Sequence, residues 1–269
     1  MASKIMGIVN VTTDSFSDGG KYLDPDRAVR KSLDLTGEGA SIIDLGGESS
    51  HPDSVNISAE EEIERLTPII KALKQENIII SVDTYKPKVM KEVLELGVDI
   101  INDITGLDDE ESIAIIKDYQ PTIVLMFSAY SQGRANKNQW YKEDPVGEIL
   151  SFFEEKLQQL ESHGIKSEKV ILDPGMGFFL GANPRPSLEV LSKLSEFKRL
   201  GQRILMSTSR KSFIGSVLKN KVSERRAGTL ATEIWATLQG VDFIRTHDVK
   251  ALSDAIKMIQ AIQNPGLYH

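Results

Sequence analysis

The chain has 269 residues, 40% hydrophobic and 26% charged, so it can bury a substantial core, and its composition excludes disordered, collagen-like and coiled-coil proteins. Its 39 acidic and 32 basic side chains give a net charge of −7, the wrong sign for a protein that follows a phosphate backbone, which excludes nucleic acid as its main partner. The absence of cysteine excludes disulfides, zinc–thiolate clusters and a thiolate nucleophile.

No export signal or membrane segment is expected. The first eleven residues contain one lysine and no continuous apolar stretch of the kind found in a secretory signal. No run approaches the roughly twenty apolar residues needed to span a bilayer. The sequence therefore predicts a cytoplasmic protein that does not use a membrane as a partner.

Eight short apolar runs rich in β-branched residues alternate with longer stretches of helical periodicity. In chain order, the expected strands are residues 5–11, 41–45, 78–83, 99–104, 122–127, 169–172, 203–207 and 242–246. The average repeat of about 34 residues is long enough for a strand, a loop and a helix, which predicts an α/β protein folded as a single-domain (β/α)8 TIM barrel over residues 1–269. An open doubly wound sheet is the alternative, but the glycine pairs at 19–20 and 46–47 lack its G-x-G-x-x-G spacing.

Caps and glycines give the expected limits of several helices. The expected starts are Asp24-Pro25 and Ser58, and the expected ends are Gly37, Gly97 and Gly164. An amphipathic helix is expected over residues 145–163. The polar segment before it, residues 130–144, is a candidate lid.

Polar residues follow nearly every expected strand. In a barrel of this kind, the carboxyl ends of the strands meet at the face that carries the active site. In strand order these residues are Asn10 with Thr12-Thr13-Asp14-Ser15, Asp44 with Glu48, Asp83, Asn102-Asp103, Asp173, Ser209-Arg210-Lys211-Ser212, and Arg245 with His247. One such residue is usually a turn former or a helix cap, but their recurrence around the ring predicts a binding site.

Two of these carboxylates, Asp83 and Asp173, each follow four apolar-rich residues, so we expect them at the barrel rim and partly desolvated. Such carboxylates can hold the adjacent N–H groups of a guanidine-like or amino-pyrimidinone ring, and Asn102 can supply a donor and an acceptor beside them. The alternative is an internal salt bridge, for example to Lys211.

Four side chains that can carry positive charge follow the last two expected strands, namely Arg210, Lys211, Arg245 and His247. Barrels of this type often bind phosphate there, so the sequence predicts an anionic ligand, with solvated surface ion pairs as the alternative. The four histidines show no ligand spacing for a tightly held zinc. Asn10 together with substrate phosphates could hold Mg²⁺.

Seven strings resemble the dihydropteroate synthase family in the same order: GIVNVTTDSFSDGG, IDLGGESSHPD, SVDTYKP, INDITG, LDPGMGF, TSRKSFIG and IRTHDV. The resemblance runs from Ile5 to the last helix. It implies a (β/α)8 barrel, usually a homodimer, that condenses hydroxymethyl-dihydropterin diphosphate with para-aminobenzoate. Diphosphate is released and dihydropteroate is formed for folate synthesis.

The same resemblance implies roles for individual residues. The pterin-holding positions are Asp83, Asn102, Asp173 and Lys211, and the positions for diphosphate and its Mg²⁺ are Asn10, Arg245 and His247. The expected catalytic set is Asp83, Asp173, Lys211, Arg245 and His247. Two loops, Thr12, Thr13, Asp14, Ser15 and Phe16, then Ser49, Ser50, His51 and Pro52, are expected to close over the site and complete the aminobenzoate pocket with Phe178 and Ser212. Met126 and Phe179 complete the expected substrate-binding residues.

The chain departs from the usual family pattern mainly around the second substrate. Ser50-His51-Pro52-Asp53 stands where Thr-Arg-Pro-Gly is common, Phe179-Leu180 where Gly-Lys is common, and Met126-Phe127-Ser128 where Met-His is usual. The SHPD and GFFLG strings resemble the sulfonamide-insensitive branch of the family. Since sulfonamides mimic para-aminobenzoate, the bulk of Phe179 is expected to reshape the drug's space and to spare the smaller substrate.

Two other functions share the expected pterin pocket. One is a barrel that transfers a methyl group from methyltetrahydrofolate to a corrinoid, although such domains do not need the TTDSF and SRKS elements. The other is a catalytically silent pterin-binding protein. Asn10, Asp14, Arg245 and His247 argue against the silent protein, because a chain without turnover has no need of diphosphate-binding residues.

Overall fold

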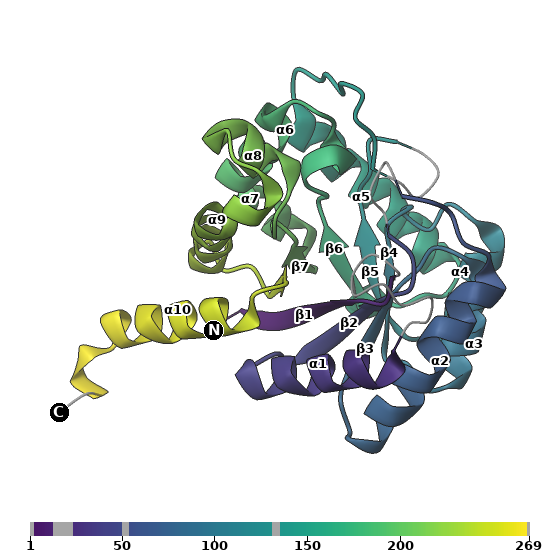
Figure 1. The fold of residues 1–269 in the computed structure, drawn as a ribbon. Helices are drawn as coiled ribbons and strands as arrows, with labels where there is room; N and C mark the ends of the chain where they lie inside the picture. The colour runs from purple at the N-terminus through teal and green to yellow at the C-terminus, as the bar shows by residue number, and fades with distance from the viewer. Residues whose placement is uncertain (1–2, 13–23, 50–53, 131–134, 268–269) are drawn as a thin grey trace.

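Eight parallel strands form a closed barrel in sequence order, with β8 hydrogen-bonded back to β1 (Figure 1). The computed structural model describes residues 3–12, 24–49, 54–130 and 135–267. The strands are β1 (Lys4–Asn10), β2 (Ile42–Gly46), β3 (Ile80–Asp83), β4 (Ile100–Asp103), β5 (Thr122–Met126), β6 (Val170–Asp173), β7 (Arg203–Met206) and β8 (Phe243–Thr246). The predicted TIM barrel is confirmed, and no open edge is left of the kind that an open doubly wound sheet would have.

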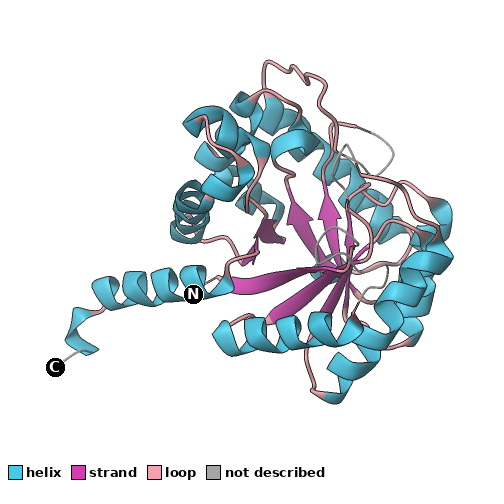
Figure 2. Ribbon diagram, viewed as in Figure 1, coloured by secondary structure: helices cyan, strands magenta, loops and turns pink. Residues whose placement is uncertain are grey.

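Helices surround the barrel and cover the outer faces of its strands (Figure 2). They are α1 (Pro25–Glu38), α2 (Ala59–Gln75), α3 (Pro87–Glu95), α4 (Glu110–Tyr119), α5 (Pro145–Ser162), α6 (Pro184–Ser192), α7 (Leu194–Phe197), α8 (Ser212–Leu218), α9 (Arg226–Leu238) and α10 (Val249–Gln263). Short 3-10 helices are η1 (Ser167–Lys169), η2 (Gly177–Leu180), η3 (Lys198–Leu200), η4 (Val222–Glu224) and η5 (Pro265–Leu267). Within the described ranges, no helix combines the length and apolar character needed to cross a membrane.

The predicted helix starts are confirmed, and one predicted end is wrong. The side chains of Asp24 and Ser58 accept backbone N–H groups at the starts of α1 and α2. Gly37 lies inside α1, which continues to residue 38 and is closed by Gly39 at φ 115°. The helix ends there because Gly39 adopts the left-handed conformation that returns its N–H to the last carbonyls, whereas Gly37 has no positive φ.

The barrel interior changes from apolar to polar along the strands. Because successive strand side chains point to opposite faces, every second residue points inward. One inward cluster is apolar and consists of Met6, Ile42, Ile100, Val124, Ile171, Leu205 and Phe243. Two residues further along the same strands are Ile8, Asp44, Asn102, Met126, Asp173, Ser207 and Arg245. The apolar layer therefore forms a floor, and charged and amide groups lie above it toward the carboxyl ends.

The segment predicted as a candidate lid is attached to the barrel where it is described. The backbone N–H of Asn136 donates to the Phe178 carbonyl at 3.1 Å, and that of Ala182 donates to the Asn138 carbonyl at 3.1 Å. Ala135 is buried against Phe179. Residues 131–134 lie outside the described residues, and the rest of the segment forms part of the wall beside η2.

Candidate functional site

A cavity of about 350 Å³ opens at the carboxyl ends of the strands. Nine of the residues that the family resemblance assigns to the site line it: Asn10, Ser49, Asp83, Phe178, Phe179, Lys211, Ser212, Arg245 and His247. They come from all along the sequence, and the closed barrel brings them together because the carboxyl ends of its strands form one ring.

The remaining predicted residues lie next to this cavity or outside the described chain. Asn102 is the register partner of Asp83, and Met126 is the register partner of Asp173, so the pairs come from adjacent strands. Thr12 follows β1 and is half-buried. Thr13, Asp14, Ser15, Phe16, Ser50, His51 and Pro52 lie outside the described residues.

Arg245 occupies the centre of the polar layer. Its Nε donates to Oδ2 of Asp44 at 2.7 Å, and its Nη2 donates to Oδ2 of Asp83 at 2.8 Å. The sequence placed Arg245 among the cations for an anionic ligand, and the internal salt bridge that it offered as the alternative for Asp83 was to Lys211. The structure shows an internal salt bridge from Arg245 instead, because β8 directs this side chain inward at the same level as the carboxylates from β2 and β3.

Burial shifts the ionisation of both predicted pterin carboxylates. Removal from water raises the pKa of Asp83 to about 7, with Asp44 adding to the rise and Arg245 opposing it. Burial likewise raises the pKa of Asp173 to about 6. Asp173 accepts the N–H of Gly175 at 2.8 Å, which fixes one carboxylate oxygen at the turn after β6. Both groups therefore ionise near neutral pH, as binding-site carboxylates often do.

Lys211 lies on the face of an aromatic ring. Its Nζ is 4.6 Å from the centre of the Phe179 ring, within cation–π range. Burial and the neighbouring Arg245 charge lower the pKa of Lys211 to about 8. The ammonium is thus a positive group of reduced basicity beside an apolar wall formed by Phe179, Met126, Ile104 and Ala135.

His247 is neutral in the free site, contrary to its predicted place among the cations. Burial lowers its pKa to about 3, and the charges of Arg210, Arg245 and Lys211 add to the effect. Its Nδ1 lies 2.9 Å from Oγ of Ser209, and its backbone N–H donates to the same oxygen at 3.2 Å. The imidazole is therefore held as a hydrogen-bonding group, and Arg210 and Lys211 supply the positive charge on this side.

The sequence placed three further residues among the polar strand ends without giving any of them an individual role, and the structure shows what each one does. Asp44 is fully buried and shares Arg245 with Asp83. Ser209 holds His247, and Glu48 lines the cavity while contacting Lys86. Asp44 lies two residues after the inward-facing Ile42, just as Arg245 lies two residues after Phe243. The alternation of side chains along a strand therefore places Asp44 and Arg245 in the same inward-facing layer.

Few protein ligands are available for a metal ion. Across the parts of the chain that the structure describes, no group of three or more His, Cys, Asp and Glu side chains could hold one. Asn10 is exposed at the end of β1 and lines the cavity, and its amide oxygen is the ligand type that Mg²⁺ accepts. The exposed Asn10 amide fits an ion that is held mainly by substrate phosphates.

Comparison with known proteins gives a consistent result. The family model described as "Pterin binding enzyme" matches residues 6–247. The chain is 47% identical over 261 residues to "Dihydropteroate synthase type-3" of Escherichia coli, covering 97% of this chain and 99% of that protein.

Two solved structures are also similar over nearly the whole chain. Dihydropteroate synthase from Clostridium difficile, determined in the presence of pteroic acid, has a TM-score of 0.87 and 42% identity, covering 97% of each chain. The Xanthomonas albilineans enzyme with 4-aminobenzoic acid has a TM-score of 0.89 and 34% identity, covering 97% of this chain and 93% of that one.

Proposed function

The chain belongs to the pterin-binding enzyme family, and from this membership we propose how its cavity carries out the reaction of its named relatives. It is a dihydropteroate synthase, a transferase that condenses hydroxymethyl-dihydropterin diphosphate with para-aminobenzoate. The observation that carries the residue assignments is the contact of Arg245 with Asp44 and Asp83 in one polar layer beside the cavity.

Asp83, Asn102 and Asp173 are assigned to the pterin ring. Their strands are β3, β4 and β6, and their side chains lie at the same end of the barrel above its apolar floor. A carboxylate has several acceptor positions and can accept paired N–H groups from the ring, and the amide can donate and accept beside it. Lys211 closes this side of the pocket next to Phe179.

Arg245, Arg210 and His247 are assigned to the diphosphate end. Arg245 and Arg210 supply charge, and the neutral His247 supplies a hydrogen bond, its imidazole oriented by Ser209. Asn10 would hold the Mg²⁺ that accompanies the diphosphate, and the ion would supply further positive charge to the phosphate oxygens.

The proposed reaction separates bond breaking from bond formation. The C–O bond to diphosphate breaks with its electron pair leaving on the diphosphate, and a delocalised pterin methylene cation is left. Asp83 and Asp173 stabilise that cation electrostatically. The neutral aniline nitrogen then forms the C–N bond and releases a proton to solvent, so no strong general base is required. The side chains around the cavity orient the two substrates and limit access of water to the cation.

The second substrate is assigned to the wall formed by Ser49, Phe178, Phe179 and Ser212. Phe179 is almost fully buried against Met126 and Ile104, so its ring has a fixed position. We further propose that this ring narrows the space for sulfonamides and spares para-aminobenzoate, which makes the enzyme sulfonamide-insensitive. Equal inhibition by sulfamethoxazole of this chain and of a family member with Gly-Lys at positions 179–180 would refute this.

The function is tested by mixing both substrates with Mg²⁺ and measuring diphosphate release together with dihydropteroate formation. A silent pterin-binding protein would bind the ring and release no diphosphate. A methyltransferase-like barrel would instead demethylate methyltetrahydrofolate in the presence of a corrinoid. Removal of Mg²⁺ with a chelator should reduce turnover, and turnover that is indifferent to the chelator would contradict the proposed role of Asn10.

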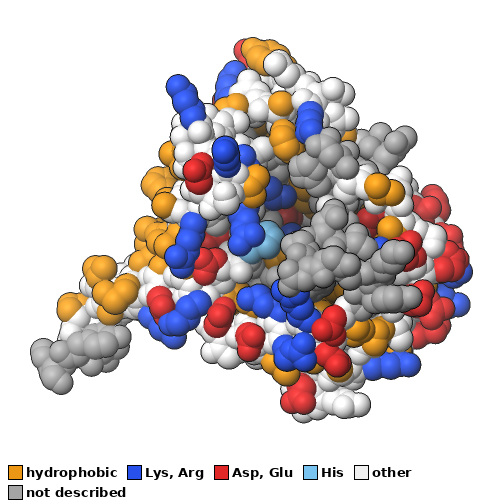
Figure 3. All heavy atoms as spheres, in the orientation of Figure 1, with side chains coloured by type: hydrophobic (Ala, Val, Ile, Leu, Met, Phe, Trp, Pro, Cys, Tyr) orange, Lys and Arg blue, Asp and Glu red, His pale blue; other side chains and the backbone are white. Residues whose placement is uncertain are grey.

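We also propose that the protein is a homodimer. Exposed apolar side chains gather on the side of the molecule from which α10 projects (Figures 1 and 3). Trp235 and Leu238 lie on α9, and Met258 and Ile262 lie on α10. Such a surface is typical of an interface between protein chains.

A further inference from the structure

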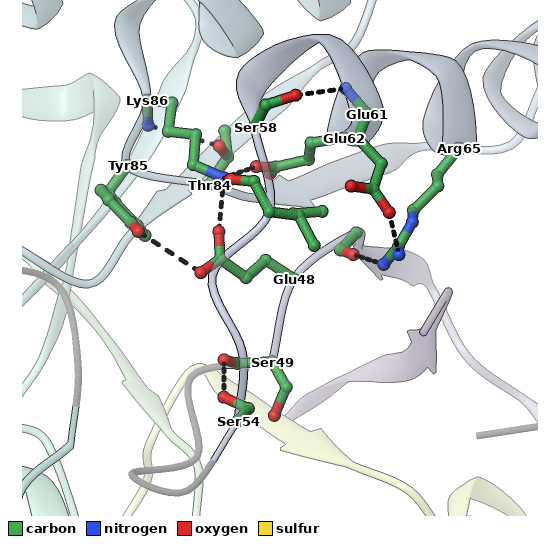
Figure 4. A network of polar contacts seen from close by, with 12 residues as sticks. Glu48, Ser49, Ser54, Ser58, Glu61, Glu62, Arg65, Thr84, Tyr85 and Lys86 are labelled. Carbon is green, nitrogen blue, oxygen red and sulfur yellow. Dashed lines mark hydrogen bonds and ion pairs between the residues drawn. The ribbon is translucent and has the colours of Figure 1, made fainter. Parts of the chain in front are cut away.

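A buried ion cluster joins the loop after β2, helix α2 and the start of α3 (Figure 4). Nζ of Lys86 contacts Oε2 of Glu48 and lies 2.7 Å from Oε2 of Glu62. The side chains of Glu48 and Glu62 are 6% and 1% exposed, so these pairs are largely shielded from water. Loss of one partner of a buried pair is far more costly than loss of a surface pair, because the remaining buried charge is left uncompensated.

Lys86 also connects two separated parts of the chain. Its ammonium donates to the backbone carbonyl of Ile57 at 2.9 Å, in addition to its contact with Glu48. Glu48 precedes residues 50–53 in the sequence and Ile57 follows them. One buried ammonium therefore holds the described chain on both sides of that segment.

The cluster reaches the cavity through Glu48. Glu48 and Ser49 line the cavity, whereas Lys86 and Glu62 are not among its lining residues. The hydroxyl of Tyr85 donates to Oε1 of Glu48 at 3.5 Å, and the Tyr85 ring packs on the apolar cluster that contains Phe179. Glu48 is thus connected to both the ion cluster and the aromatic wall.

We propose that Lys86 is a positioning residue that holds the Glu48 and Ser49 wall of the cavity in place for para-aminobenzoate. This rests on the proposed function, which assigns Ser49, the neighbour of Glu48, to the wall for the second substrate. The pterin groups Asp83, Asn102 and Asp173 are positioned by β3, β4 and β6 and make no described contact with Lys86. The effect of losing Lys86 should therefore fall on the second substrate and spare the first.

The test compares Lys86→Met with Lys88→Met. Lys88 is two residues away and also pairs with a glutamate of α2, Glu60, but both members of that pair are exposed, which makes Lys88 a matched control. We expect Lys86→Met to raise KM for para-aminobenzoate about tenfold or more, because small displacements of positioning groups have effects of that size. KM for the pterin substrate should stay within about twofold, Lys86→Arg should recover most of the loss, and Lys88→Met should behave as wild type.

A double-mutant cycle separates positioning from general destabilisation. Glu48→Gln alone should raise KM for para-aminobenzoate, which keeps the inference testable if Lys86→Met folds poorly. Combining Glu48→Gln with Lys86→Met should add little, because both changes act through Glu48. Multiplicative effects, or equal rises in both KM values, would overturn the positioning role. Wild-type enzyme without turnover would overturn the proposed function itself, whereas active wild type with Lys86→Met equal to Lys88→Met overturns only this inference.

Discussion

Arg245 is the residue on which the charge balance of the cavity depends. Its guanidinium serves two buried carboxylates, Asp44 and Asp83, so it is held by the protein before any phosphate arrives. Burial alone would lower the pKa of Arg245, but these two carboxylates raise it, and the group stays charged. In the proposed reaction, Arg245 would therefore both attract the leaving diphosphate and neutralise the two carboxylates of the protein.

Removal of Arg245 should therefore cost stability as well as activity. We expect Arg245→Ala to lower the free energy of unfolding by about 3 kcal/mol, because Asp44 and Asp83 lose their buried cation. Urea unfolding measures this, with Arg226→Ala as the control. Arg226 forms an exposed pair with Asp248, and its loss should cost less than about 1 kcal/mol. Equal losses in the two variants would show that the Arg245 pairs contribute little.

The raised carboxylate pKa values predict a pH dependence of pterin use. Asp83 and Asp173, with pKa values of about 7 and about 6, must be ionised to accept paired hydrogen bonds from the ring. As the pH falls through 7 and then 6, protonation removes these acceptors, so kcat/KM for the pterin substrate should fall. The free energy of unfolding should change in the opposite direction. Because folding raises the pKa of these carboxyls, stability decreases as the pH rises from the unfolded pKa near 3.8 to the folded values.

The measurement is the kcat/KM profile from pH 5 to pH 9 at saturating para-aminobenzoate. Because the charges of Arg245 and Lys211 act on both carboxyls, the fall should appear as the titration of a set of groups. Asp173→Asn should lose pterin affinity at every pH, and its residual profile should keep the fall near pH 7. A profile that stays flat down to pH 5 would be incompatible with these carboxylates as ring acceptors.

At the level of elements, strands were easier to predict than helix ends. All eight expected strands are confirmed within about two residues, because a buried parallel strand requires a short run of apolar, mainly β-branched residues. The helix end predicted at Gly37 was wrong because the presence of a glycine does not reveal its φ angle, and Gly39, two residues later, takes the left-handed conformation.

Asp103, another polar residue at a strand end, accepts the N–H groups of Thr105 and Leu107, so it stabilises the turn after β4.

Two glycine substitutions should therefore have opposite effects on stability. Gly175 has φ 72°, and an added Cβ would lie 2.2 Å from the carbonyl oxygen of Phe127, so Gly175→Ala should destabilise the fold by about 2 kcal/mol or more. Gly37→Ala, in open space on α1, should stabilise it by about 0.5–1 kcal/mol. Denaturant unfolding of both variants measures this.

The Gly175 variant should also lose pterin affinity, because the Gly175 N–H holds Asp173. Gly37→Ala should leave pterin affinity unchanged and serves as the control. If both variants had the same unfolding free energy, the left-handed turn after β6 would not be the constraint that we infer.

On the scale of the whole molecule, the sequence predicted which residues meet but not how they pair. The ring of polar residues at the strand ends can be predicted from the sequence, because each of them follows an apolar run. Which of these side chains form ion pairs depends on their heights along the barrel axis. Arg245 and Asp44, which do form a pair, are 201 positions apart in the sequence. The cluster of Lys86, Glu48 and Glu62 was missed for the same reason, since its three members come from separate parts of the chain. Pairing of this kind becomes predictable only once the register between strands is fixed.

The far end of α10 supports a prediction about assembly. All of the buried residues of α10 lie at Ile256 or before it, while Met258 and Ile262 are 60% and 72% exposed. Because two large apolar side chains one turn apart are unfavourable in water, we expect this face to be covered by a second copy. Wild-type protein should sediment at twice the 29.8 kDa of one chain.

The double variant Met258→Glu/Ile262→Glu should sediment as a monomer, because four buried carboxylates cannot be accommodated at a twofold interface without cations. Ile79→Glu introduces the same charge at an exposed apolar position outside α9 and α10, and it should leave the dimer intact. Sedimentation equilibrium at micromolar concentration measures all three proteins. A monomeric wild type, or a dimeric double variant, would exclude this surface as the interface.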